Sequence, residues 1–216
     1  MSIEVMVRQM TAGFGQTCLI FFLTLIFSLP LGMIVYFGRV CRFKPLSWLV
    51  KIYISIMRGT PLMLQLLIWY FGPFYLWGMN IGGYKFTAII LGCSLNYAAY
   101  FAEIFRGGIQ SIPVGQHEAS QVLGLTKTQT FFHIVLPQVM KRVLLPVSNE
   151  VITLVKDTSL ANVIAVSELF RAAKNEASRT ASIEPLFVAG LFYLLMNGVV
   201  SLIFNRLNRR MAYYKD

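Results

Sequence analysis

The chain has 216 residues, of which 56% are hydrophobic and only 13% are charged, and its mean hydropathy is +0.64. A soluble domain usually carries roughly a quarter charged residues, so this composition excludes a disordered protein and argues against a soluble enzyme. The net charge is +10, but the basic residues stand between long apolar runs, whereas a nucleic-acid-binding protein presents them on a polar surface. We therefore predict an integral membrane protein that binds no nucleic acid.

Five stretches of the sequence approach the length of about 20 mostly apolar residues that a membrane-crossing helix needs. Charged residues mark the gaps between them. The fourth stretch is less regular than the others because Glu150 lies inside it. The predicted fold class is an all-α integral membrane protein, with one transmembrane domain over residues 1–216 and spans at about 11–37, 48–71, 84–104, 137–155 and 185–204.

The basic residues also predict an orientation. With the N-terminus outside, 12 Lys and Arg residues fall in inside segments and 6 in outside segments, while Arg58 lies within the second span. Because cytoplasmic loops carry an excess of Lys and Arg, we expect the N-terminus outside and the C-terminus inside. Residues 106–136 then form a cytoplasmic loop, and 159–182 form an amphipathic helix over the outer face. The expected interface anchors are Trp48, Trp69, Trp77, Tyr213 and Tyr214.

The cytoplasmic loop is too polar to cross a bilayer, yet its pattern predicts two short helices. Pro113 suits a first helical turn and Gly124 a helix stop. Thr126-Lys127-Thr128-Gln129 then matches a capping box, in which the Thr hydroxyl and the Gln side chain satisfy free backbone amides. The second helix should end at Leu136, because the following Pro137 disfavours helical angles at the residue before it.

A signature of fixed spacing runs through this loop. Glu118-Ala119-Ser120, Gly124 and Ile134-Val135-Leu136-Pro137 together resemble the EAA signature of ABC-importer permease subunits. The family pattern is EAA, three residues, Gly, nine residues and I-x-L-P, and only Ser120 departs from it. The resemblance implies a coupling helix that docks in a groove of a separate ATP-binding subunit. It assigns this contact to Glu118, Ala119, Ser120, Gly124, Leu125, Ile134 and Pro137.

Other stretches resemble the polar amino-acid branch of these permeases, the histidine, glutamine, arginine and cystine type. They are Arg58-Gly59-Thr60-Pro61-Leu62, the segment 96–108 and Val155-Lys156-Asp157-Thr158-Ser159-Leu160. The resemblance implies a type I ABC-importer permease fold in a bacterial cytoplasmic membrane. It also implies two ATP-binding subunits that hold ATP and Mg, a second permease subunit (this chain or a paralogue) and an extracytoplasmic amino-acid-binding protein. This chain itself would carry no cofactor.

The fourth span has a narrow polar face. At 100° per residue, its polar residues share an arc of about 120°, and they should avoid lipid because a lipid-facing charge costs several kcal/mol. Pro146 lies in the same arc and can kink the helix. We expect Asn96 and Tyr100 of the third span to face this stripe across a small cavity. The residues of the polar face are Asn149, Glu150, Thr153, Lys156 and Asp157.

Such a cavity suits an amino acid. Glu150 or Asp157 could accept the ammonium group, and Lys156 or a backbone amide could bind the carboxylate. Plainer roles remain open: Lys156 and Asp157 could end the helix in water, and Glu150 could bond to a neighbouring span. Glu103 and Arg106 could form an i,i+3 ion pair at the membrane boundary.

The break at Arg58-Gly59-Thr60-Pro61 in the second span has two readings: a gate, or a simple kink from which Arg58 reaches inward.

Two other function classes are less well supported. The sequence contains no GxxxxGK[ST] nucleotide-binding run. Its two histidines, His117 and His133, lie 16 residues apart without a pattern for a metal or a catalytic triad, so we expect neither an enzyme nor a metal site. The alternative is a stand-alone secondary transporter or channel for small polar solutes, but such folds usually need about ten or more spans.

Overall fold

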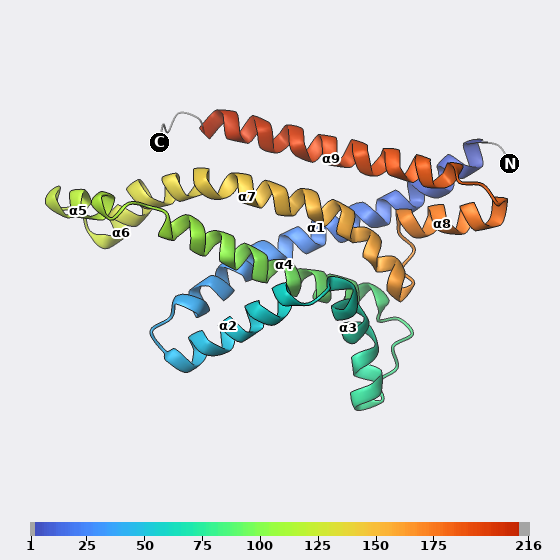
Figure 1. The fold of residues 1–216 in the computed structure, drawn as a ribbon, viewed down its shortest axis with the longest axis horizontal. Helices are drawn as coiled ribbons and strands as arrows, with labels where there is room; N and C mark the ends of the chain where they lie inside the picture. The colour runs from blue at the N-terminus through green and yellow to red at the C-terminus, as the bar shows by residue number, and fades with distance from the viewer. Residues whose placement is uncertain (1–2, 212–216) are drawn as a thin grey trace.

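The computed structural model describes residues 3–211, and its regular elements are all helices (Figure 1). The all-α class is thus confirmed, whereas the expected anchors Tyr213 and Tyr214 lie outside the described residues. The elements in chain order are α1 Ile3–Val40, α2 Lys44–Gly59, α3 Leu62–Trp77, α4 Lys85–Gln110, α5 Val114–Val122, α6 Lys127–Gln129, the π-helix η1 Thr130–Val135, α7 Leu136–Asp157, the 3₁₀-helix η2 Thr158–Ile164, α8 Leu169–Thr180 and α9 Glu184–Met211.

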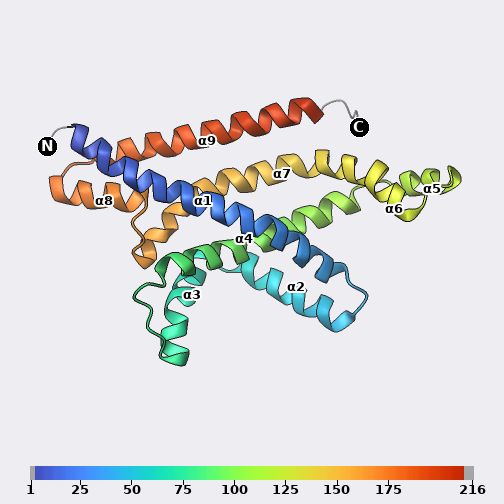
Figure 2. The same cartoon turned by 180° about the vertical axis from the view of Figure 1, so that it is seen from behind.

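The long helices run roughly along one axis, and the short helices α5, α6 and α8 lie at the two ends of that axis (Figures 1 and 2). The small helices α5 and α6 lie at one end, together with the start of α7. At the opposite end lie α8, the beginning of α1 and the beginning of α9. Helix α3 projects sideways from the bundle. The two segments that the sequence places on opposite sides of a membrane, 106–136 and 159–182, therefore stand at opposite ends of the molecule.

Three of the described helices are long and apolar enough to cross a membrane: α1 from Met10 onward, α4 and α9. The pair α2 and α3 would make a fourth if it is counted as one broken span. Helix α7 is not among them, because the charges of Lys141, Arg142 and Glu150 interrupt its apolar sequence. The described helices thus give three to four candidate spans.

The second predicted span, at 48–71, is not one straight helix. It covers parts of α2 and α3, which meet at an angle of 111°. Thr60 between them is extended, with φ −122° and ψ 149°. The sequence explains the break, because Pro61 disfavours helical angles at the residue before it and then begins the next helix as its N-cap.

The prediction that helix geometry ends at Leu136 was wrong. Leu136 is helical, with φ −57° and ψ −45°, and the chain runs without a stop from η1 into α7. Pro137 stands in the first turn of α7, where the missing amide hydrogen of proline does little harm. The preceding turn is a π-helix, whose wider spacing alters the hydrogen-bond ladder just before the proline. The second loop helix is therefore a continuation of α7.

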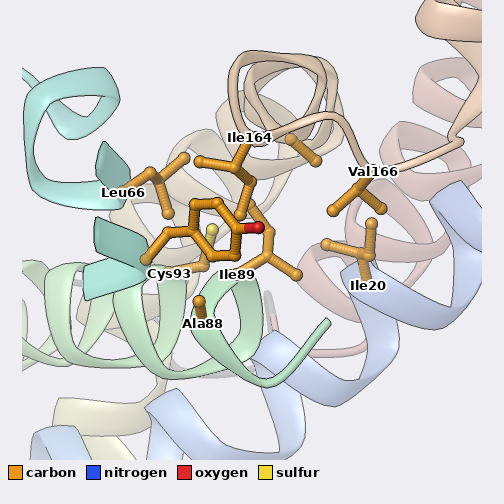
Figure 3. Close-up of a cluster of buried hydrophobic side chains, with 9 residues drawn as sticks. Ile20, Leu66, Ala88, Ile89, Cys93, Ile164 and Val166 are labelled. Atoms are coloured by element: carbon orange, nitrogen blue, oxygen red, sulfur yellow. The ribbon is translucent and has the colours of Figure 1, made fainter. Parts of the chain in front are cut away.

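The largest contact in the molecule joins α1 to α4, and the core lies around this crossing. Figure 3 shows one of its clusters, in which side chains from α1, α3, α4 and the segment around η2 meet. Ile20, Ile89 and Cys93 are fully buried there. This packing fixes the first half of α4 between the other helices. The second half, from Tyr100 onward, lines the cavity described below.

Candidate functional site

A cavity of about 630 Å³ lies where the end of α2 meets α4 and α7. Two carboxylates and three guanidinium groups share its wall with an aromatic ring and two glycines. It is therefore a charged, open cavity where the third and fourth predicted spans meet the start of the predicted cytoplasmic loop. Its lining is Arg58, Tyr100, Glu103, Ile104, Arg106, Gly107, Gly108, Ser111, Arg142, Pro146 and Glu150.

The cavity brings together several residues that the sequence singles out, and four of them are proposed site or kink residues. Tyr100 comes from α4, Pro146 and Glu150 from α7, and Arg58 from the last turn of α2. The guanidinium carbon of Arg58 lies 5.2 Å from the centre of the Tyr100 ring, which is a cation–π distance. The carboxylate of Glu150 on α7 and the guanidinium group of Arg58 on α2 thus line one space. The Tyr100 ring of α4 lies against the guanidinium group.

Glu103 holds a cluster of arginines at the edge of this cavity. The expected pair with Arg106 is present, with an Nη2–Oε2 distance of 2.8 Å. Arg39 of α1 also contacts Glu103, with its Nε 2.9 Å from Oε1, and Arg58 lies farther off at 3.8 Å. Glu103 is therefore well neutralised by Arg39 and Arg106, and Arg58 is the most loosely held of the three.

The expectation that Asn96 faces the polar side of α7 is wrong. Asn96 is buried, and its amide donates 2.9 Å hydrogen bonds to the carbonyl of Met57 and to the side chain of Gln65. Gln65 in turn donates to the carbonyls of Met57 and Thr60. These carbonyls lose their helical partners where α2 ends, so Asn96 closes the break between α2 and α3 instead of lining the cavity.

Tyr97, the neighbour of Asn96, is the residue that sequence reasoning missed. Its hydroxyl donates a 2.7 Å hydrogen bond to Oδ2 of Asp157 and joins α4 to the end of α7. No sequence pattern around Tyr97 pointed to a partner 60 residues further along the chain. Asn149 and Lys156 are exposed and Thr153 is half-buried, so the cavity described above gathers only Glu150 from the predicted polar face.

The loop at 106–136 has the local geometry that its EAA-like motif predicts. Gly124 has φ +72°, a left-handed conformation that side chains rarely adopt, and it ends α5. The capping box at Thr126 and Gln129 is confirmed. Ser120 is buried and donates a 2.6 Å hydrogen bond to the carbonyl of Gln116, which explains a small polar residue there. Glu118 and Ala119 are exposed.

Apolar side chains are exposed on the same loop. Val122 and Leu123 are 89% and 75% exposed at the tip of the molecule, and Leu125 and Ile134 are half-buried. An exposed apolar tip on a small rigid helix is typical of a surface that another protein covers.

The outer segment is more structured than one amphipathic helix. Residue Ala165 has a left-handed conformation after η2, and α8 then begins with Glu168 as its cap. The fully buried carboxylate of Glu168 accepts hydrogen bonds from two backbone amides and from the Tyr193 hydroxyl. Burial raises the pKa of Glu168, and these donors oppose that rise. A hydrogen bond from Arg179 lowers the pKa of Glu176 on the same helix.

Within residues 3–211, no group of three or more His, Cys, Asp or Glu side chains is arranged to hold a metal ion.

The sequence comparisons identify relatives along nearly the whole chain. Residues 10–213 match the family of binding-protein-dependent transport system inner membrane components. The chain is 37% identical to the L-cystine transport system permease protein TcyB of Bacillus subtilis (strain 168), over 94% of this chain and 88% of that protein. It is 36% identical to the arginine transport system permease protein ArtQ of the same organism, over 92% and 90% of the two chains.

The fold has a solved counterpart as well. The crystal structure of an amino acid ABC transporter with histidines contains a chain that superposes with a TM-score of 0.87 at 31% identity, over 97% of this chain and 99% of that chain. The match of family, sequence and fold agrees with the resemblance that the loop at 106–136 carries. The chain belongs to the family of binding-protein-dependent transport system inner membrane components.

Proposed function

We propose that this chain is a membrane-spanning permease subunit of an ATP-driven amino-acid importer, and that it forms the translocation pathway in a bacterial cytoplasmic membrane. The observation that carries the proposal is the cavity in which Glu150 and Arg58 line one space of about 630 Å³. Free amino acids are zwitterions, so a carboxylate and a guanidinium group suit their two charged ends. The relatives named for L-cystine and arginine support this substrate class.

The proposed topology has five spans in one domain, with the N-terminus outside and the C-terminus inside. The bent pair α2 and α3 makes the second span, and α7 makes the fourth with Glu150 turned toward the cavity. Two observations support this. The segments predicted for opposite sides lie at opposite ends of the bundle, and Glu150 lies against the cavity, which removes the cost of a lipid-facing charge.

In the proposed substrate site, Glu150 accepts the ammonium group and Tyr100 covers the bound molecule. Thr153 and Asp157 follow Glu150 on α7 at i+3 and i+7, so they extend the same face along the helix axis. Asp157 accepts the Tyr97 hydroxyl and lies beyond the lining of the cavity. Arg58 lines the cavity with Glu150 and takes the carboxylate in place of the exposed Lys156.

The chain itself hydrolyses no ATP under this proposal. Two copies of an ATP-binding subunit supply that reaction with their own ATP and Mg, and α5 with its exposed tip docks into one of them. A second permease subunit, either this chain or a paralogue, completes the pathway. An extracytoplasmic binding protein delivers the amino acid near α8 at the other end.

Co-purification from the membrane tests this arrangement. The permease should retain an ATP-binding subunit in detergent. Glu118→Arg or Gly124→Asp in the coupling loop should abolish that retention, while Glu184→Arg, an equal charge reversal at the opposite end, should not. Retention that is unchanged in all three variants, or amino-acid transport by the permease alone in liposomes, would contradict the proposal.

A further inference from the structure

A second cavity opens on the surface of the bundle between α1, α7 and α9. It has a volume of about 340 Å³, and apolar side chains and one thiol line it. Phe22, Val199 and Ile203 are each more than half exposed, so this space is a groove at the surface. Its lining is Phe14, Cys18, Phe21, Phe22, Leu25, Val151, Met196, Val199, Val200, Ile203 and Phe204.

Arginines follow directly at one end of this groove. Arg206, Arg209 and Arg210 are exposed in the last turns of α9. Positions 199, 203, 206 and 210 are spaced i, i+4, i+7 and i+11 and therefore share one face of the helix. On that face the apolar residues Val199 and Ile203 are followed by Arg206 and Arg210. A stretch of the α9 surface includes all three arginines together with Val199 and Ile203 of the groove. The apolar and basic surfaces are therefore continuous.

The length of the groove corresponds to one leaflet of a bilayer. Its α9 residues run from Met196 to Phe204, which is roughly 12 Å at 1.5 Å per residue. Half of the hydrocarbon core measures about 15 Å. An acyl chain in the groove would thus have its headgroup at the level of the arginines, where a phosphate can accept several charge-assisted hydrogen bonds.

A second copy of this chain fits the same surface less well. A two-fold interface centred on this groove would bring the same patch of each copy together, so it would gather the three arginines of each copy in one contact. Like charges that face each other across an interface are unfavourable. A negatively charged lipid headgroup is instead attracted to the three arginines and neutralises their charge.

We propose that this groove binds an anionic phospholipid of the cytoplasmic leaflet, with an acyl chain between α1 and α9 and the phosphate on Arg206, Arg209 and Arg210. The choice of leaflet rests on the orientation given under the proposed function. The lipid would hold α9 against the bundle at the end where α5 meets the ATP-binding subunit.

Native mass spectrometry of the assembled transporter tests this site. The complex is mixed with dioleoyl phosphatidylglycerol or dioleoyl phosphatidylcholine in detergent, and the retained lipid is counted. Replacing all three arginines by Gln should lower phosphatidylglycerol retention by about tenfold or more. Ile203→Trp, which fills the groove with an apolar side chain, should lower it as well. The matched control replaces Arg42, Lys44 and Lys51, three exposed cations in the turn after α1 and in α2, by Gln and should keep the wild-type value.

Equal retention of the two lipids by the wild-type complex, or an equal loss in the arginine variant and its control, would overturn the proposal. So would an Ile203→Trp complex that loses a permease subunit and keeps its lipid, since a second copy then occupies the groove. The assay contains neither amino acid nor ATP, so a failed lipid site leaves the transport proposal standing. A complex that retains phosphatidylglycerol but shows no ATP-driven uptake contradicts the transport proposal alone.

Discussion

The hydroxyl of Tyr97 donates a 2.7 Å hydrogen bond to Oδ2 of Asp157, and this bond ties the middle of α4 to the last residue of α7. Tyr97 is only 2% exposed, so few water molecules can replace the donor. Hydrogen bonds to charged groups contribute about 1.5–3 kcal/mol. The pair therefore holds the two helices that form the main walls of the cavity.

Tyr97→Phe removes that donor and keeps the ring. We expect the purified complex to melt several degrees lower, as measured by differential scanning fluorimetry. Tyr75→Phe provides the control, because Tyr75 is 77% exposed on α3. Equal melting temperatures for the two variants would show that the Asp157 contact does not stabilise the fold.

Glu150→Gln tests the proposed ammonium site. The amide keeps the shape of the side chain but loses its charge, so we expect the amino-acid concentration that half-stimulates ATP hydrolysis to rise by roughly tenfold to a hundredfold. Assembly with the ATP-binding subunit should be unchanged. Glu184→Gln removes an exposed carboxylate at the start of α9 and should have no effect. Unaltered stimulation of the Glu150→Gln complex would remove this residue from the site.

The two adjacent glycines of α4 differ in their surroundings. A methyl group on Gly108 would collide with the side chain of Val143 on α7, whereas one on Gly107 would meet nothing within 4 Å. Overpacking of this kind typically costs about 1–3 kcal/mol. Gly108→Ala should therefore lower the melting temperature of the complex, and Gly107→Ala should leave it unchanged or raise it. The reverse order would contradict the close approach of α4 and α7.

A similar pair tests the coupling loop. Ala at Gly124 must adopt the left-handed conformation, at a cost of about 1–2 kcal/mol. Ala at Gly115 lies within the exposed helix α5 and meets nothing within 4 Å. We expect Gly124→Ala to reduce the amount of ATP-binding subunit that co-purifies with the permease, and Gly115→Ala to preserve it. If both variants retain the same amount, the turn at Gly124 does not position the docking surface.

Local signals in the sequence predicted local structure well. The helix stop at Gly124 and the capping box at Thr126 depend on a few neighbouring residues, and both are present. The break before Pro61 could also be predicted, although the 111° between α2 and α3 depends on how each half packs. At Leu136 a local rule failed, because the π-helical turn before it accommodates Pro137 within a continuous helix.

The candidate site could be predicted only in part. The polar face of α7 identified Glu150, because a charge in an apolar helix must turn inward. Helical spacing alone could not show which helix faces which side of α4. The unpaired carbonyls of Met57 and Thr60 draw Gln65 and Asn96 to the break between α2 and α3, and Tyr97 is left to face α7. The contacts of Asn96 and Tyr97 join residues far apart in the chain, so no local pattern reveals them.

ATP-dependent uptake in liposomes tests the central claim most directly. The permease would be reconstituted with and without the ATP-binding subunits, with the binding protein and a labelled amino acid outside and ATP inside. The account predicts uptake only in the complete assembly, and none when a non-hydrolysable ATP analogue is enclosed. Uptake by the permease without ATP-binding subunits would contradict it.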